Sequence, residues 1–168
     1  MQNILKRQAL VALAALLTFS CANPRKADVV IYGATSGGIA AAIQSSRMGK
    51  SVILLEPGTH IGGLTTGGLS WTDIGNKAVV GGIAREFYQR IKKRYEDPKS
   101  WTSETRDEYF VRRRGPNAKD EDAMWTFEPK IASAVYDEML AEAKVKVITR
   151  ARLDLAADRK STRLNSSH

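Results

Sequence analysis

The sequence is poor in the residues that build metal sites, disulfide frameworks and catalytic histidine arrangements. Cys21 is its only cysteine, which excludes an internal disulfide framework and any site built from several cysteines. Of its two histidines, His60 lies outside the terminal segment, and no partners are spaced around it for a zinc site or a serine–histidine–aspartate triad. The sequence therefore predicts no metal site.

The chain also lacks a long basic stretch interleaved with aromatic residues, although its formal net charge is +8. Lys6 and Arg7 supply +2 of this charge and residues 158–168 supply another +2, so the rest of the chain carries +4. Binding to nucleic acid normally needs basic residues clustered on one face or along a helix. We therefore expect no nucleic-acid partner.

The N-terminal segment, residues 1–22, has the pattern of a signal peptide. A short basic region precedes the apolar run from Ala9 to Phe19, which is too short to span a bilayer comfortably. Two cleavage sites are compatible with the sequence. Cleavage after Ala22 would release a soluble mature protein, whereas cleavage before Cys21 would leave a lipidated cysteine at the N-terminus. The sequence thus predicts an exported protein that is either periplasmic or anchored to the cell envelope through Cys21.

The C-terminal residues Asp158–His168 resemble, residue for residue, the translation of a common sequencing-library adapter. A natural polar tail would match it along its whole length only by coincidence. We therefore expect a disordered, adapter-derived tail and a natural gene that continues beyond Ala157. On this interpretation residues 23–27 are a linker and residues 28–157 are the N-terminal part of a larger domain.

The clearest pattern in the chain is a strand, a glycine-rich turn, a helix and a second strand. Val29–Tyr32 is apolar and rich in β-branched residues, as expected for a parallel strand covered on both faces. The turn Gly33–Gly38 leads into a helix of small residues, Ile39–Met48, which Gly49 is placed to end. Ser51–Leu55 follows as a second buried strand. This βαβ unit predicts an α/β fold with a parallel sheet.

The turn and the acid after the second strand predict a nucleotide site. Glycine lets the backbone approach a pyrophosphate, and the free N–H groups and dipole of the helix's first turn favour its negative charge. Glu56 follows about twenty residues later, where a carboxylate accepts hydrogen bonds from ribose hydroxyls and repels a 2′-phosphate. Thr35 stands at the second glycine position of the usual fingerprint, and its hydroxyl could donate to a phosphate oxygen. The predicted contacts in the turn are Gly33, Ala34, Thr35, Ser36, Gly37 and Gly38.

The segment after Glu56 distinguishes an NAD-binding protein from an FAD-binding one. An NAD-binding dehydrogenase would normally continue promptly into another helix and strand, whereas two glycine doublets follow here, Gly62-Gly63 and Gly67-Gly68. Two doublets this close together make a costly loop without a ligand to order it. An NAD-dependent dehydrogenase and a non-catalytic, nucleotide-binding surface lipoprotein stay as alternatives.

At these residues the chain resembles the FAD-dependent oxidoreductases that carry the nucleotide-binding fold of glutathione reductase and fumarate reductase. It is most similar to a family of exported bacterial flavoproteins, some of which are labelled xanthan lyase-like. The likeness covers roughly Asp28 to Ile148 and is strongest in DVVIYGATSGGIAAAIQSSRMGKSVILLEP, HIGGLTTGGLSWTD and FEPKIASAVYDEML.

The resemblance implies a Rossmann-like FAD-binding domain and an enzyme that transfers hydride between flavin and an organic small molecule. It places Gly62 and Gly63 against the FAD phosphates, with Thr65 or Thr66 as hydroxyl donors and Val147 near the adenine. It also directs Leu69–Asp73 toward the flavin ring. The substrate, for which a carbohydrate-related compound is one hypothesis, and the catalytic residues are not readable. Catalytic residues usually come from the later substrate domain, so the fragment alone is expected to be inactive.

The remaining patterns predict two helices and a strand. Gly82–Tyr95 is amphipathic, with its basic residues on the wetter side, and Pro129–Ala143 has a broad apolar face. Val145–Thr149 follows as a strand. The highly charged stretch 96–122 shows no sustained period, and we interpret it as a solvated insertion, with an acid-binding role for its arginine run, 112–114, as the alternative.

Overall fold

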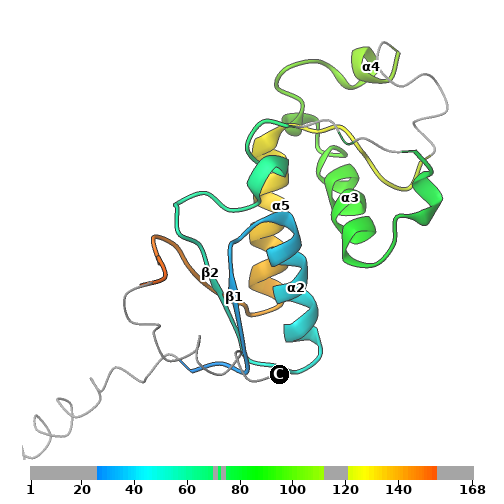
Figure 1. The fold of residues 1–168 in the computed structure, drawn as a ribbon. Helices are drawn as coiled ribbons and strands as arrows, with labels where there is room; N and C mark the ends of the chain where they lie inside the picture. The colour runs from blue at the N-terminus through cyan, green and yellow to red at the C-terminus, as the bar shows by residue number, and fades with distance from the viewer. Residues whose placement is uncertain (1–25, 70–71, 73–74, 112–120, 155–168) are drawn as a thin grey trace, which may run out of the picture.

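The computed structural model describes residues 26–69, 72, 75–111 and 121–154 (Figure 1). The segments predicted as signal peptide and adapter-derived tail, together with the arginine run, lie outside these residues. No helix in the described ranges is long and apolar enough to cross a membrane.

The sheet has three parallel strands, β1 (Val29–Tyr32), β2 (Val52–Leu55) and β3 (Lys146–Ile148), in the order β1-β2-β3. Ile31 of β1 lies beside Leu54 of β2, and Leu54 lies beside Val147 of β3. The predicted α/β class with a parallel sheet is therefore confirmed.

Helix α2 (Ser36–Arg47) starts earlier than the sequence predicted. The prediction began the helix at Ile39 because three glycines and a serine suggested an open turn. In the structure the Thr35 side chain accepts a hydrogen bond from the Gly38 N–H and caps the helix, so Ser36 and the next glycines form its first turn. Gly49, with φ +80°, follows the helix as expected.

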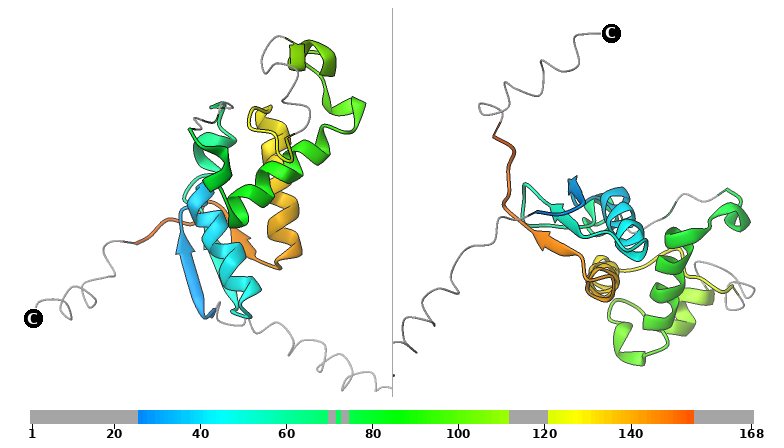
Figure 2. Two further views of the ribbon diagram at one scale, coloured as in Figure 1. Left: turned by 90° about the vertical axis from the view of Figure 1, so that its right-hand side faces the viewer. Right: turned by 90° about the horizontal axis from the view of Figure 1, so that it is seen from below.

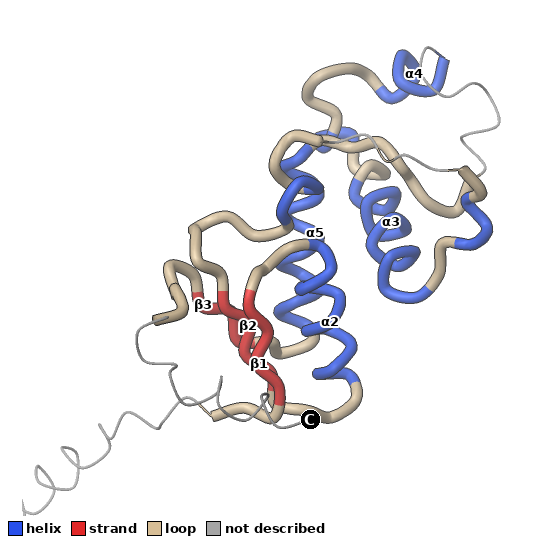
Figure 3. The backbone as a smooth tube through the Cα atoms, viewed as in Figure 1, coloured by secondary structure: helices blue, strands red, loops and turns tan. Residues whose placement is uncertain are grey.

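Helices α2 and α5 (Pro129–Glu142) pack beside each other against one face of the sheet, and α3 (Gly82–Arg94) lies farther from it, against α5 (Figures 2 and 3). The sequence predicted both later helices. In each, the last predicted residue is the C-cap rather than part of the helix. The prediction that β1 is covered on both faces is wrong for the described part of the chain. Val30 and Tyr32 are 56% and 46% exposed, because they point away from the helix-covered face.

Most described residues of the charged stretch 96–122, which are 96–111, 121 and 122, are exposed, as expected for a solvated insertion, although local helices form within it. It contains a short 3-10 helix, Pro98–Ser100, and α4 (Arg106–Tyr109), which a capping box of Thr105 and Glu108 begins. Two other 3-10 helices, Gly63–Thr65 and Lys77–Val79, precede α3. Among the described residues of the charged stretch Tyr109 and Phe110 are buried, and the aromatic residues Tyr95, Trp125 and Phe127, which flank the stretch in sequence, are buried as well.

Charged side chains join α3 to α5. The Arg90 guanidinium bonds two glutamates of α5, with distances of 2.8 Å to Glu138 and 2.6 Å to Glu142, and it also pairs with Glu86 on its own helix. The hydrogen bonds that Arg90 donates to Glu142 raise the pKa of Arg90, although burial opposes them. The Arg90 side chain is only 22% exposed. The basic side of α3, which was predicted to face solvent, therefore forms part of the contact with α5.

Candidate functional site

The glycine turn after β1 depends on two glycines for different reasons. Gly33 has φ +99°, a left-handed conformation that other residues rarely adopt. A Cβ on Gly38 would stand 2.0 Å from the Gly33 carbonyl oxygen, so only glycine lets α2 start this close to β1. A Cβ on Gly37 would meet only the Thr35 hydroxyl, at 3.9 Å, so packing does not require that glycine.

Glu56 lies beside this turn at the carboxyl end of β2. Its Oε2 accepts a hydrogen bond from the Ala34 N–H at 2.9 Å, and its Oε1 accepts one from the Gly58 N–H at 2.8 Å. These two bonds fix the carboxylate next to the start of α2. The structure thus brings together the predicted turn and the predicted acid.

The second glycine segment packs onto the first. The Gly62 N–H donates to the Ala34 carbonyl at 2.6 Å, and a Cβ on Gly63 would lie 3.6 Å from the Thr35 Cα. Gly62 and Gly63 both have positive φ, at +95° and +56°. Two segments that were assigned separately from the sequence therefore form one surface.

Three hydroxyl groups meet where these segments join. The Ser36 Oγ lies 2.7 Å from the Thr65 Oγ1 and donates to the Gly62 carbonyl at 3.1 Å. The Tyr136 phenol of α5 interacts with this pair: burial raises its pKa, and the hydroxyls of Ser36 and Thr65 lower it. Sequence reasoning counted Tyr136 only as part of an apolar helix face. A tyrosine on such a face was the one available signal, because buried tyrosine hydroxyls usually have partners.

Two other residues predicted to contact FAD, Thr66 and Val147, lie outside this hydroxyl cluster. Thr66 is 5% exposed, and its hydroxyl bonds the Ile61 carbonyl and the His60 ring rather than joining the hydroxyl cluster. Val147 lies in β3 and lines a separate hollow with His60 and Asp137. Of the stretch predicted to run toward the flavin ring, only Leu69 and Thr72 are within the described residues.

The comparison with known families decides the class of protein. Residues 28–167 match the family described as FAD dependent oxidoreductase. The chain belongs to this family. A search of curated proteins finds no match.

The chain is also similar to solved structures, each at low identity. They include THI4 from Thermovibrio ammonificans (14% identity, 89% of this chain and 46% of that one, TM-score 0.41). An L-amino acid deaminase from Proteus vulgaris has 19% identity, 77% and 46% coverage and a TM-score of 0.42. The 3-ketosteroid-delta4-(5alpha)-dehydrogenase from Rhodococcus jostii RHA1 has 16% identity, 80% and 40% coverage and a TM-score of 0.41. The chain spans less than half the length of each of these proteins.

The residues at the glycine turn suit a dinucleotide. The first-turn N–H groups of Ser36 and Gly37 cannot bond within the helix, and no bond is found for them among the described residues. The Thr35 hydroxyl, which accepts from Gly38, keeps its own proton for donation. Apart from Gly33 and its two chain neighbours, no heavy atom lies within 4 Å of where a Gly33 Cβ would stand. Donors for a diphosphate and a carboxylate for a ribose thus lie next to each other at the turn.

Proposed function

We propose that this chain is the FAD-binding part of an exported enzyme that transfers hydride between flavin and an organic small molecule. The observation that carries the proposal is the packing of Gly62-Gly63 onto the turn Gly33–Gly38, with Glu56 fixed beside it. Family membership supports the redox chemistry, which the bound flavin would supply.

Each part of the surface would have a separate task in holding FAD. The N–H groups of Ser36 and Gly37 and the hydroxyl of Thr35 would bind the diphosphate, where the dipole of α2 adds to the attraction. Glu56 would accept hydrogen bonds from the ribose hydroxyls of the adenosine. Gly62 and Gly63 would let the second segment approach the phosphates, with Thr65 near them, and Val147 would lie toward the adenine.

The proposal is tested by titrating the purified chain with FAD and comparing Glu56→Gln with Glu96→Gln, the same change at an exposed site. The Glu56 substitution removes a charged acceptor, so FAD affinity should fall by about tenfold or more, while the control should bind as wild type. Circular dichroism melts of both variants would separate lost binding from lost folding. A chain that binds NADH and takes up no FAD would overturn the proposal in favour of an NAD-dependent dehydrogenase.

The export of the protein and its anchor are a separate part of the proposal. Residues 1–22 support a signal peptide, and Cys21 supports a lipid anchor at the cell envelope. Labelling of the expressed protein with a radioactive fatty acid should be abolished by Cys21→Ala. An unlabelled protein with a mature N-terminus after Ala22 would replace the anchor with release into the periplasm.

A further inference from the structure

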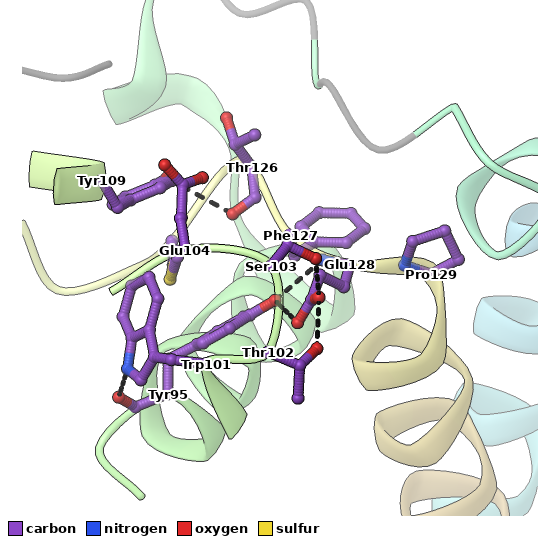
Figure 4. Close-up of a pocket in the computed structure, with 11 residues that line it drawn as sticks. Tyr95, Trp101, Thr102, Ser103, Glu104, Tyr109, Thr126, Phe127, Glu128 and Pro129 are labelled. Carbon is purple, nitrogen blue, oxygen red and sulfur yellow. Dashed lines mark hydrogen bonds between the residues drawn. The ribbon is translucent and has the colours of Figure 1, made fainter. Parts of the chain in front are cut away.

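Two hollows of the molecule differ in whether their polar groups already bond one another. In the cavity between the end of α3 and the start of α5 they do, since Thr102 and Ser103 donate to the Glu128 carboxylate at 2.8 and 2.6 Å (Figure 4). A larger hollow, of about 840 Å³, lies at the amino ends of the three strands. We call it the basic hollow, because its charged groups are all lysines.

Four lysines line the basic hollow: Lys26, Lys50, Lys144 and Lys146. All four are exposed, and within the described ranges no hydrogen bond or ion pair is found for their ammonium groups. Asp28, which is not in the lining, has a carboxylate that accepts from the Ser51 N–H and hydroxyl at 2.8 and 2.7 Å. These bonds lower the pKa of Asp28, and the charge of Lys50 adds a smaller effect. The hollow therefore presents positive charge with little compensation.

The parallel sheet explains why these lysines meet. Lys26 precedes β1, Lys50 precedes β2 and Lys146 begins β3. Parallel strands begin at the same edge of a sheet, so residues far apart in sequence come together there. The glycine turn and Glu56 follow the opposite, carboxyl ends of β1 and β2. The basic hollow and the proposed cofactor site thus lie at opposite ends of the sheet.

Helix ends account for only part of the cluster. α2 and α5 both end at this edge, and a cation near the C-terminus of a helix favours its dipole, which gives Lys50 and Lys144 a structural role. Lys26 and Lys146 belong to the strand side and follow no helix end. Four ammonium groups around one hollow repel one another, which opposes folding. An anionic partner would turn this repulsion into attraction.

The form of the hollow indicates what kind of anion suits it. Its lysines are exposed around a wide opening rather than buried around a small one, which suits a surface of many phosphates better than one enclosed anion. No aromatic residue is in its lining, so no side chain there could stack on a nucleic-acid base. Met48, next to Gly49 of the lining, is an apolar side chain that is 69% exposed. Lysines beside an exposed apolar residue are typical of a membrane-surface contact.

We propose that the basic hollow binds the phosphate groups of an anionic lipid surface. The inference rests on the proposed export, because Cys21 precedes Lys26 by five residues, which span at most about 18 Å. A lipid at Cys21 would hold the chain near the membrane without fixing its orientation. Attraction between anionic headgroups and the four lysines would turn the amino ends of the strands toward the lipid. The glycine turn and Glu56 would then point away from the membrane.

The test is co-sedimentation with lipid vesicles of the mature form that begins at Asn23. This form has neither the signal peptide nor the lipid, so the result depends neither on lipidation of Cys21 nor on FAD. Vesicles of phosphatidylglycerol and phosphatidylcholine in equal parts should bind it at least about tenfold more tightly than phosphatidylcholine alone. The preference should disappear when the ionic strength is raised from about 0.1 to about 1 M, which shortens the Debye length from about 10 to about 3 Å.

Matched double variants separate the basic hollow from the net charge of the chain. Lys144→Gln with Lys146→Gln should weaken binding to the anionic vesicles about tenfold or more. Lys93→Gln with Lys99→Gln removes the same charge from two exposed lysines outside the hollow and should bind nearly as wild type.

A second pair in the hollow, Lys26→Gln with Lys50→Gln, should weaken binding as well and serves if circular dichroism shows that the first pair fails to fold. Equal losses in the hollow and control variants, or no preference for anionic vesicles, would overturn the proposal. Tighter binding to a single-stranded oligonucleotide than to the vesicles would replace the lipid with nucleic acid. None of these outcomes bears on the FAD titration, so the proposed cofactor site is tested separately.

Discussion

The βαβ unit and the α3–α5 pair are held together by different kinds of contact. Where β1 meets α2, backbone lies on backbone, and a single methyl group at Gly38 would overlap the Gly33 carbonyl. Between α3 and α5, aromatic rings and several ion pairs share the contact, as in the stacked rings of Phe87 and Tyr136, 4.4 Å apart. A contact made by backbone alone tolerates no added side chain. A contact made by many side chains should instead lose part of its stability with each substitution.

The sharpest test of this contrast is Gly38→Ala. The new Cβ would lie 2.0 Å from a backbone oxygen that no side-chain rotation can move, so β1 and α2 must separate. We expect a loss of about 3 kcal/mol or more in unfolding free energy, measured by urea denaturation. Gly37→Ala is the matched control, because its Cβ would meet nothing closer than 3.9 Å, and it should stay within about 1 kcal/mol of wild type. Equal midpoints for the two variants would remove the distinction.

In the other region the largest effect is expected for Arg90→Met. The substitution keeps the aliphatic stem but leaves Glu86, Glu138 and Glu142 without their shared cation at a site that is 22% exposed. We expect a loss of about 2 kcal/mol, between the values for exposed and buried ion pairs. Arg94→Met removes one bond to Glu138 from a 45% exposed side chain and should cost about 0.5 kcal/mol or less. Similar losses for both would show that Arg90 has no central role.

A smaller effect is expected at Tyr136→Phe, where the two regions meet. The variant keeps the ring that stacks on Phe87 and removes only the hydroxyl that interacts with Ser36 and Thr65. We expect a loss of about 1 kcal/mol, since the two remaining hydroxyls still bond each other. Tyr88→Phe, which removes the acceptor of a single long bond of 3.3 Å from Thr72, should have less effect. Unchanged stability in both variants would mean that the hydroxyl cluster does not join α5 to the turn.

The βαβ unit could be predicted because its signals are local. β1 has the predicted bounds, and the glycine turn and Glu56 are where the pattern placed them. The start of α2 was missed because glycines oppose a helix by propensity, while the cap from Thr35 and the contact with β1 outweigh that preference. Propensity alone does not contain such tertiary contacts.

The stretch between α3 and α5 could not be predicted, because its contacts join residues far apart in sequence without a period. The Tyr95 hydroxyl donates to the Glu128 carboxylate and accepts from the Glu128 N–H, although more than one helix separates the two residues in sequence. Trp101 packs between Tyr95 and Tyr109. Tyr136 shows the same limit, since its helical position predicts burial but not the partner of its hydroxyl. The packing of Gly63 on Thr35 likewise needed the structure, because each glycine segment alone is compatible with a surface loop.

The smallest expected effect is the dependence of the α3–α5 contact on pH. Hydrogen bonds from Arg47 and Arg90 lower the pKa of Glu86, against burial, and the hydrogen bond from Arg90 lowers the pKa of Glu142. Carboxylates with a lowered pKa in the folded state stabilise it fully above their ordinary value of 4.5 and lose that contribution as the pH falls through the folded pKa. The gap in unfolding free energy between wild type and Arg90→Met should therefore be constant near neutral pH and shrink in acid. Urea denaturation of both proteins across this range checks it, and a gap that persists in acid would mean that Arg90 acts through packing of its stem rather than through its charge.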